Sequence, residues 1–211
     1  MPPSPVPPSG DGLVDGDASS HLEELIHGAL PSVEAAEEMG VGVDVELVGP
    51  HLRLSGTIGL GRFRRLSDLV SHHDGLIGLR NATILRRNGT ATRVTAPMIW
   101  VSPAEVSLIG ESTSEMREAP PEFRITKDRL DLVFVTPGHT LTGQVHIVVG
   151  GQFASFIESN DPPFIPLTDA RTRSLADRRI IARYDFALLN RRHIVATTVL
   201  APEMVRGRSV L

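Results

Sequence analysis

The sequence predicts a mainly β protein of two tandem five-stranded units, each a small barrel or roll, and three observations support this. One is an internal repeat, in which two stretches match without a gap 87 positions apart. The matched pairs are Asp44 and Asp131, Pro50 and Pro137, and Gly56 and Gly143. The second is apolar–polar alternation, as in 43–47, which is typical of strands because successive side chains point to opposite faces. The third is a globular composition, with 41% apolar and 22% charged residues.

Size and composition limit what these units can be. Each repeat has roughly 70 to 80 residues, so each alone would be marginally stable, and we expect the two to pack together or against other subunits. The chain has no cysteine, which excludes disulfides, thiolate catalysis and cysteine-bound zinc. The formal net charge of −4 argues weakly against non-specific nucleic-acid binding.

The compartment is inferred from what the sequence lacks. The N-terminal stretch has neither the basic nor the apolar region of a signal peptide, and no apolar run approaches about 18 residues. We therefore expect a soluble cytoplasmic protein of bacterial type that does not insert into a membrane.

The chain begins with two segments outside the β repeats. Residues 1–19 are rich in proline and are expected to be a disordered tail or linker, since proline removes backbone donors. Ser20 and Glu23 have the spacing of a capping box, which predicts a short helical segment before the first strand. This helix and the first β repeat make up 20–110.

The first repeat is predicted from its alternation and turn residues. Strands are expected at 43–48 and 52–58, 76–85, 93–101 and 106–109, with a short helical turn within 62–70 and a tight turn at 102–105. Gly56 lies in the middle of a strand, which indicates a sharp bend or a close backbone approach. Asn88-Gly89 predicts a hairpin turn between the third and fourth strands.

The second repeat follows a polar linker at 111–127 and occupies 128–200, before a C-terminal tail at 201–211. After one inserted residue in the second repeat the match resumes, because 76–82 and 164–170 are 88 positions apart. Strands are expected at 130–136, 140–149, 164–173, 179–189 and 193–200, and 152–157 replaces the short helical turn.

Two resemblances rest on these segments. The run RLSDL at 65–69 and the run FIPLTDA at 164–170 resemble an uncharacterised bacterial domain family, which implies no function. The helix, the five short strands and IWVSPAEVSLI at 99–109 are similar to Sm-like small barrels, which include bacterial Hfq. The RNA-contacting motifs of that class are not matched, so the resemblance implies a fold and adds little to RNA binding.

Candidate chemical sites are few. His72, His73 and Asp74 could hold a metal with a further ligand, but the second repeat has Ser-Asn-Asp there, which favours a solvated loop. Ser67 and Asp68 near a histidine suggest a hydrolase, yet no nucleophile-elbow motif surrounds them. No pattern indicates a catalytic residue, a metal site or a cofactor. The only tryptophan, Trp100, is expected in the core.

Clusters of arginine form the possible interaction surface. They are Arg62, Arg64, Arg65, Arg86, Arg87, Arg191 and Arg192. If they converge, they could bind phosphate groups of nucleic acid, or acidic protein surfaces through bidentate pairing. We favour the protein interpretation, and so expect a non-catalytic interaction, scaffold or regulatory module that assembles with a partner or with itself. The alternatives are an Sm-like RNA-binding regulator and an enzyme that the motifs do not reveal.

Overall fold

The computed structural model describes most of the two β repeats. The described residues are 41–50, 52–73, 75–86, 93–112, 127–159, 161–176 and 179–200. All of them belong to one compact unit, Val33–Leu211. The predicted tails at 1–19 and 201–211, the helix at Ser20, the Asn88-Gly89 turn and most of the linker lie outside the described residues.

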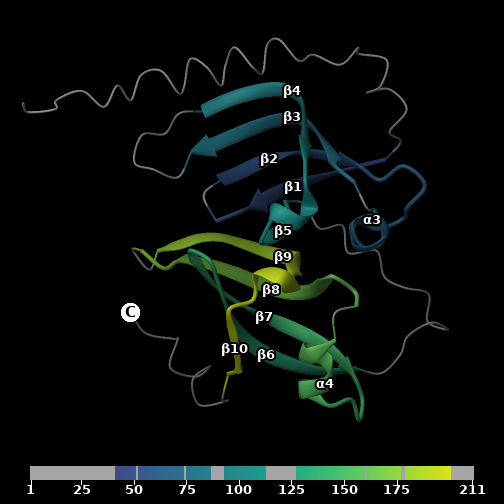
Figure 1. The fold of residues 1–211 in the computed structure, drawn as a ribbon, viewed down its shortest axis with the longest axis vertical. Coiled ribbons are helices and arrows are strands. Elements are labelled where there is room, and N and C mark those ends of the chain that lie inside the picture. The colour runs from purple at the N-terminus through teal and green to yellow at the C-terminus, as the bar shows by residue number, and fades with distance from the viewer. Residues whose placement is uncertain are drawn as a thin grey trace, which may run out of the picture. The chain divides into compact units, whose positions relative to one another are not determined.

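The two repeats have the same order of elements (Figure 1). The first repeat contains β1 (Gly42–Val48), β2 (Leu52–Gly59), α3 (Leu66–His72), β3 (Ile77–Arg86), β4 (Arg93–Val101), the 3₁₀ turn η1 (Pro103–Glu105) and β5 (Leu108–Glu111). The second contains β6 (Lys127–Thr136), β7 (His139–Val148), α4 (Phe153–Glu158), β8 (Phe164–Ser174), β9 (Ile180–Asn190), the 3₁₀ turn η3 (Arg191–His193) and β10 (Ala196–Val199). The all-β class is therefore confirmed. No helix in these ranges is long and apolar enough to cross a membrane.

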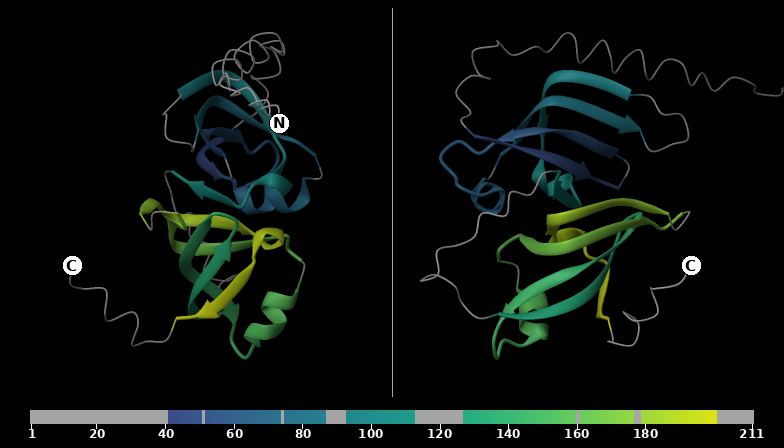
Figure 2. Two further views of the ribbon diagram at one scale, coloured as in Figure 1. Left: turned by 60° about the vertical axis from the view of Figure 1, so that its left-hand side comes forward. Right: turned by 180° about the vertical axis from the view of Figure 1, so that it is seen from behind.

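All ten strands belong to one antiparallel sheet with the order β10-β6-β7-β8-β9-β5-β1-β2-β3-β4. Within each repeat the fifth strand pairs with the first, as β5 with β1 and β10 with β6. The repeats meet where β5 lies beside β9, which Figure 2 shows at the junction of the teal and yellow strands. A single sheet therefore runs through both repeats, an arrangement that the sequence did not predict.

The opening hairpins of the two repeats are equivalent in register. Val45 lies opposite Gly56 in the first, and Leu132 lies opposite Gly143 in the second. Since 45 and 132, like 56 and 143, differ by 87, the repeat seen in the sequence is also a repeat of strand pairing.

The predicted bend at Gly56 is present, and it recurs at Gly143. The pairing of β2 with β3 shifts register around Gly56, and the pairing of β7 with β8 shifts around Gly143. A Cβ on Gly56 would lie 2.6 Å from the carbonyl oxygen of Arg80, so this position requires glycine. On the facing strands, Asn81 and Asp169 adopt left-handed φ values of 49° and 50°, which completes the bulge.

Two hydrophobic cores form, and each takes residues from both repeats. The first core is built from β1–β5 and from the apolar face of α3, but it also includes Phe164 and Leu188 of the second repeat. The second core is built from β6–β9, with α4 packed against it, and it includes Val48 and Leu108 of the first repeat. The repeats therefore stabilise each other through exchanged side chains, as the small size of each unit led us to expect.

Candidate functional site: the seam and the open sheet edges

The histidine pair that the sequence singles out is used for local structure. The Nδ1 of His72 lies 2.8 Å from the carbonyl oxygen of Asp68, and the Nε2 of His73 lies 3.0 Å from that of Leu76. A carbonyl oxygen can only accept, so both ring nitrogens carry protons and donate. Asp74 lies outside the described residues, and the described part of the chain contains no group of three potential ligands for a metal.

The serine and aspartate beside these histidines do not form a hydrolytic site. The hydroxyl of Ser67 lies 3.4 Å from the carboxylate of its neighbour Asp68. His72 contacts the backbone of Asp68 instead of its carboxylate, so the relay from acid to histidine to serine is not present.

An apolar cavity inside the first core has a volume of only about 10 Å³, roughly one water molecule, which is too small for a substrate.

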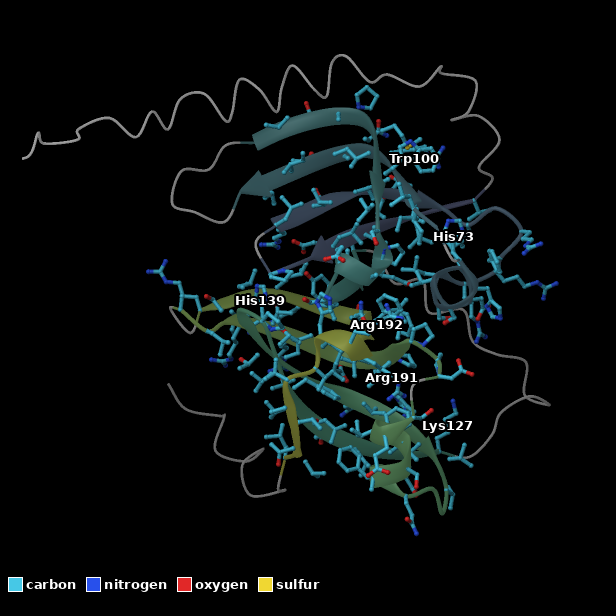
Figure 3. All side chains as sticks on the ribbon, viewed as in Figure 1. His73, Trp100, Lys127, His139, Arg191 and Arg192 are labelled. Atoms are coloured by element: carbon cyan, nitrogen blue, oxygen red, sulfur yellow. The ribbon has the colours of Figure 1, made fainter. Side chains whose placement is uncertain are left out.

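The predicted arginines lie on separate elements. Arg62, Arg64 and Arg65 are exposed in the turn that leads into α3, and Arg62 lies over the ring of Phe63 at 5.2 Å. Arg191 and Arg192 belong to η3 (Figure 3). The structure does not describe Arg87 or the side chain of Arg86.

Arg191 acts as an internal brace. Its guanidinium donates to the carbonyl oxygens of Pro162 and Phe156, each at 2.8 Å, and lies 4.9 Å from the Phe156 ring. Burial lowers the pKa of Arg191, and the nearby Asp161 partly offsets this. These contacts join η3 to α4 and to the start of β8. Arg191 is therefore not available for a partner, whereas Arg192 is exposed.

The most elaborate set of contacts lies at the seam, which we define as the junction of β5 and η1 with β9 and η3. The backbone pairs there are Leu108 with Leu189, Ile109 with Leu188 and Gly110 with Ala187. The backbone N–H of Asn190 extends this ladder by donating to the carbonyl oxygen of Ser107 at 2.9 Å. The side-chain amide of Asn190 then donates to three carbonyl oxygens around η1, those of Pro103, Ala104 and Val106, at 3.0 to 3.3 Å. Of these contacts, the one to the carbonyl oxygen of Val106 is buried, so Asn190 supplies the donor that this acceptor needs.

His193 holds the other side of the same turn. Its Nε2 donates to the carbonyl oxygen of Ala104 at 2.9 Å, and its Nδ1 lies 2.7 Å from the hydroxyl of Ser107. Because Nε2 must carry the proton to donate, Nδ1 of the neutral ring accepts from Ser107. The turn η1 of the first repeat is thus clamped by two side chains of the second.

Tyr184 closes the far end of the seam. Its ring covers Gly110 so closely that a Cβ there would lie 2.3 Å from a ring carbon. Its hydroxyl donates to Glu46 at 2.7 Å, and Glu46 in turn pairs with Arg53. Burial raises the pKa of Tyr184 to about 12, and Arg53 opposes this rise. The tyrosine is therefore neutral and bonded at any ordinary pH.

The sheet ends in two strands, β4 and β10, that pair on one side only within the described residues. These strands are the repeat equivalents of β9 and β5, the two strands that meet at the seam, because equivalent positions there are 88 residues apart. The open edges of the molecule are therefore second copies of the two edges that the seam has already joined.

Apolar side chains that are buried at the seam have exposed counterparts at the β4 edge. We call Leu76, Met98 and Trp100 the outer patch, and their equivalents in the second repeat are Phe164, Phe186 and Leu188; Met98 and Phe186 are both partly buried, so the contrast lies in the other two pairs. Trp100 is 51% exposed where Leu188 is 1% exposed, and Leu76 is 54% exposed where Phe164 is 5% exposed. The predicted core position of Trp100 is thus wrong, because its strand places it on the outward face, over Gly78 (Figure 3).

The β10 edge is apolar as well. Val195 is 69% exposed, whereas its seam equivalent Ser107 is 1% exposed. Neither 94–101 nor 195–200 contains a charged residue. Exposed edge strands are usually protected by charge, because unpaired backbone groups otherwise recruit other strands. Two uncharged edges with large exposed apolar side chains are typical of surfaces that a partner covers.

Comparisons with known proteins give no family or relative: no family model, curated protein or solved structure matches the chain. The function must therefore be argued from the seam and the edges themselves. Neither the seam nor the edges were among the sites predicted from the sequence, which were arginines and histidines. The available signal was the alignment of the two repeats, in which Trp100 is equivalent to Leu188 and Leu76 is equivalent to Phe164.

Proposed function

We propose that this chain is a non-catalytic interaction and scaffold module, located in the cytoplasm, that works by assembly with a partner or with itself through its two open sheet edges. One observation carries the proposal: Leu76 and Trp100 of the outer patch are exposed, while their equivalents Phe164 and Leu188 in the second repeat are buried against the first repeat. Extended edges of this kind bind by adding a strand, with backbone bonds for affinity and side-chain contacts for specificity.

The proposal includes a fold. We propose that each repeat is a small Sm-like or SH3-like roll, related to the domain family that the LSD and FIPLTDA runs resemble. The strand order within each repeat, with the fifth strand beside the first, supports this, as does the glycine bend in each second strand. Small rolls present edges that suit repeated assembly.

Nucleic acid is the second candidate, and the exposed Arg62, Arg64 and Arg65 favour it. It ranks lower because Arg191 is committed to internal carbonyl oxygens. An enzyme has less support, since His72, His73 and Asp68 contact one another's backbone or nearby carbonyl groups instead of forming a catalytic set.

The test is to purify the full chain under native conditions and identify what remains associated after nuclease and salt treatment. A scaffold should keep a protein partner or an oligomeric mass after nuclease, and a variant with Leu76→Glu and Trp100→Glu should lose it. A chain that stays monomeric, keeps no protein and releases only nucleic acid as salt rises would contradict the proposal and support the RNA-binding alternative. Arg64→Glu with Arg65→Glu is the matched control, because it should weaken nucleic-acid binding alone.

A further inference from the structure

We propose that the open edges are covered by further copies of this chain, with β10 of one copy adding to β4 of the next in the way that β5 adds to β9 inside one chain. This inference rests on the proposed function and names its partner. The seam is the template, because it joins the repeat equivalents of the same two strands.

The register between copies follows from the register at the seam. A shift of 88 residues converts the seam pairs Leu108–Leu189, Ile109–Leu188 and Gly110–Ala187 into Ala196–Val101, Thr197–Trp100 and Thr198–Ile99. Pro97 has no backbone N–H and so ends the pairing edge of β4, which leaves four residues, 98–101. The strand that would pair with them, β10, is also four residues long.

The side chains at the two edges are suited to this contact. At the seam, Leu188 and Phe164 leave their own repeat and complete the core of the other. In the same geometry, Trp100 and Leu76 of one copy would pack beside Ile194 and Val195 of the next, which are the equivalents of Val106 and Ser107. Exposed apolar surface on both edges would then be buried together.

The sizes of the facing side chains are complementary both at the seam and at the open edges, but the larger side chain lies on a different strand in each. At the seam, the ring of Tyr184 lies where any Cβ on Gly110 would collide with it. At the open edges the equivalent residues are Ala96 and Thr198. The side chain of Thr198 needs space that a tyrosine at position 96 would fill, and Ala96 leaves that space open.

Charge supports the same pairing. At the seam, His193 contacts the backbone of Ala104. The equivalent residues at the open edges are Glu105 and Arg192, both exposed and of opposite sign. Such a contact joins two different surfaces, so two joined copies still have one free edge of each kind between them, and repetition produces a closed ring or an open filament.

Two variants that block one edge each provide the test. Trp100→Glu blocks the β4 edge, and Val195→Glu blocks the β10 edge, since each would bury a carboxylate in the contact. Both residues are exposed, so each variant should unfold like the wild type. We expect each variant alone to be monomeric in light scattering and sedimentation, with the dissociation constant raised at least about 30-fold, because each places an unpaired carboxylate in the contact.

The decisive step is to mix the two variants. Each still has the edge that the other has lost, so we expect a one-to-one dimer that grows no further. Leu175→Glu, a similar change at an exposed apolar residue between β8 and β9, should assemble like the wild type. Since Trp100 is the only tryptophan, its fluorescence should shift to shorter wavelength as the wild type assembles.

Other outcomes would overturn the inference in distinguishable ways. If Val195→Glu assembles alone and Trp100→Glu does not, two β4 edges pair symmetrically. If Trp100 is shielded from quencher in a monomer, another segment of the same chain covers it. If the wild type does not self-associate but binds a foreign protein partner, and the Trp100→Glu variant loses that partner, the proposed function stands and self-assembly fails. If neither substitution alters any association, both fail.

Discussion

The seam and the open edges use the same pair of strands in two different situations. At the seam, β9 presents Leu188 and Asn190 to a neighbour that buries both. At the open edge, β4 presents Trp100 and Ser102 at the same positions with no described strand beside them. The difference shows that exposure in this fold depends on which edge is joined, and only partly on the residue that occupies it.

The largest expected effect is a loss of stability at Leu188 that its equivalent Trp100 does not share. Leu188→Ala should reduce the free energy of unfolding by about 2 to 5 kcal/mol, because it leaves a cavity in the first core. Trp100→Ala, measured on dilute protein, should cost about 1 kcal/mol or less, since half of that side chain already contacts water. Urea unfolding followed by circular dichroism measures both. Equal losses would mean that the outer patch is part of a core within the monomer.

Much of this fold could be predicted from the sequence because the relevant signals are local. The alternation that marks β4 predicts the bounds 93–101 that the structure shows, and Gly56 marks the bend. The predicted fifth strand is two residues too early. The N–H of Val106 bonds to Pro103 within the 3₁₀ turn, which delays the strand, and pairing with β1 extends it to Glu111.

The seam could not be predicted for a physical reason. Strand addition uses backbone groups that every residue carries, so the sequence does not show which edges meet. Both Leu188 and Trp100 are apolar, and alternation alone assigns neither to an interface. The contact between Tyr184 and Gly110 had one signal in the sequence, which is that the two repeats differ there. The equivalent positions are occupied by Ala96 and Thr198.

A second substitution examines that divergence. Gly110→Ala should cost about 3 kcal/mol, near the upper end for overpacking, because the new Cβ would collide with the ring of Tyr184 at three atoms. Thr198→Val is the matched control at the open edge and should change stability by about 0.5 kcal/mol or less. Adding Tyr184→Ala to Gly110→Ala should restore part of the loss caused by the collision. Failure of that rescue would show that the ring is not what excludes the methyl group.

The same tyrosine makes the seam sensitive to alkali, whereas the open edges have no such group. The pKa of Tyr184 is raised to about 12 from an ordinary value of 10, so the unfolded chain loses the proton first as pH rises. Its stabilising contribution is therefore complete below about pH 10 and falls between about pH 10 and 12, by at most about 2.7 kcal/mol. Tyr184→Phe should lack this part of the pH dependence. Because the chain has one tyrosine, its phenolate absorbance reports the pKa directly, and an ordinary pKa would contradict the burial of the Tyr184 side chain.

The smallest expected effect tests the polar clamp at η1. Ser107→Ala should cost about 0.5 to 1.5 kcal/mol, since it removes the donor to Nδ1 of His193 while the histidine stays partly open to water. Val195→Ala, at the equivalent open position, should change stability by about 0.5 kcal/mol or less. A double-mutant cycle with His193→Ala isolates the interaction, and the two losses at the seam should not be additive. Additive losses would mean that each side chain acts on its own, and the turn would then be held by Asn190 and the backbone ladder alone.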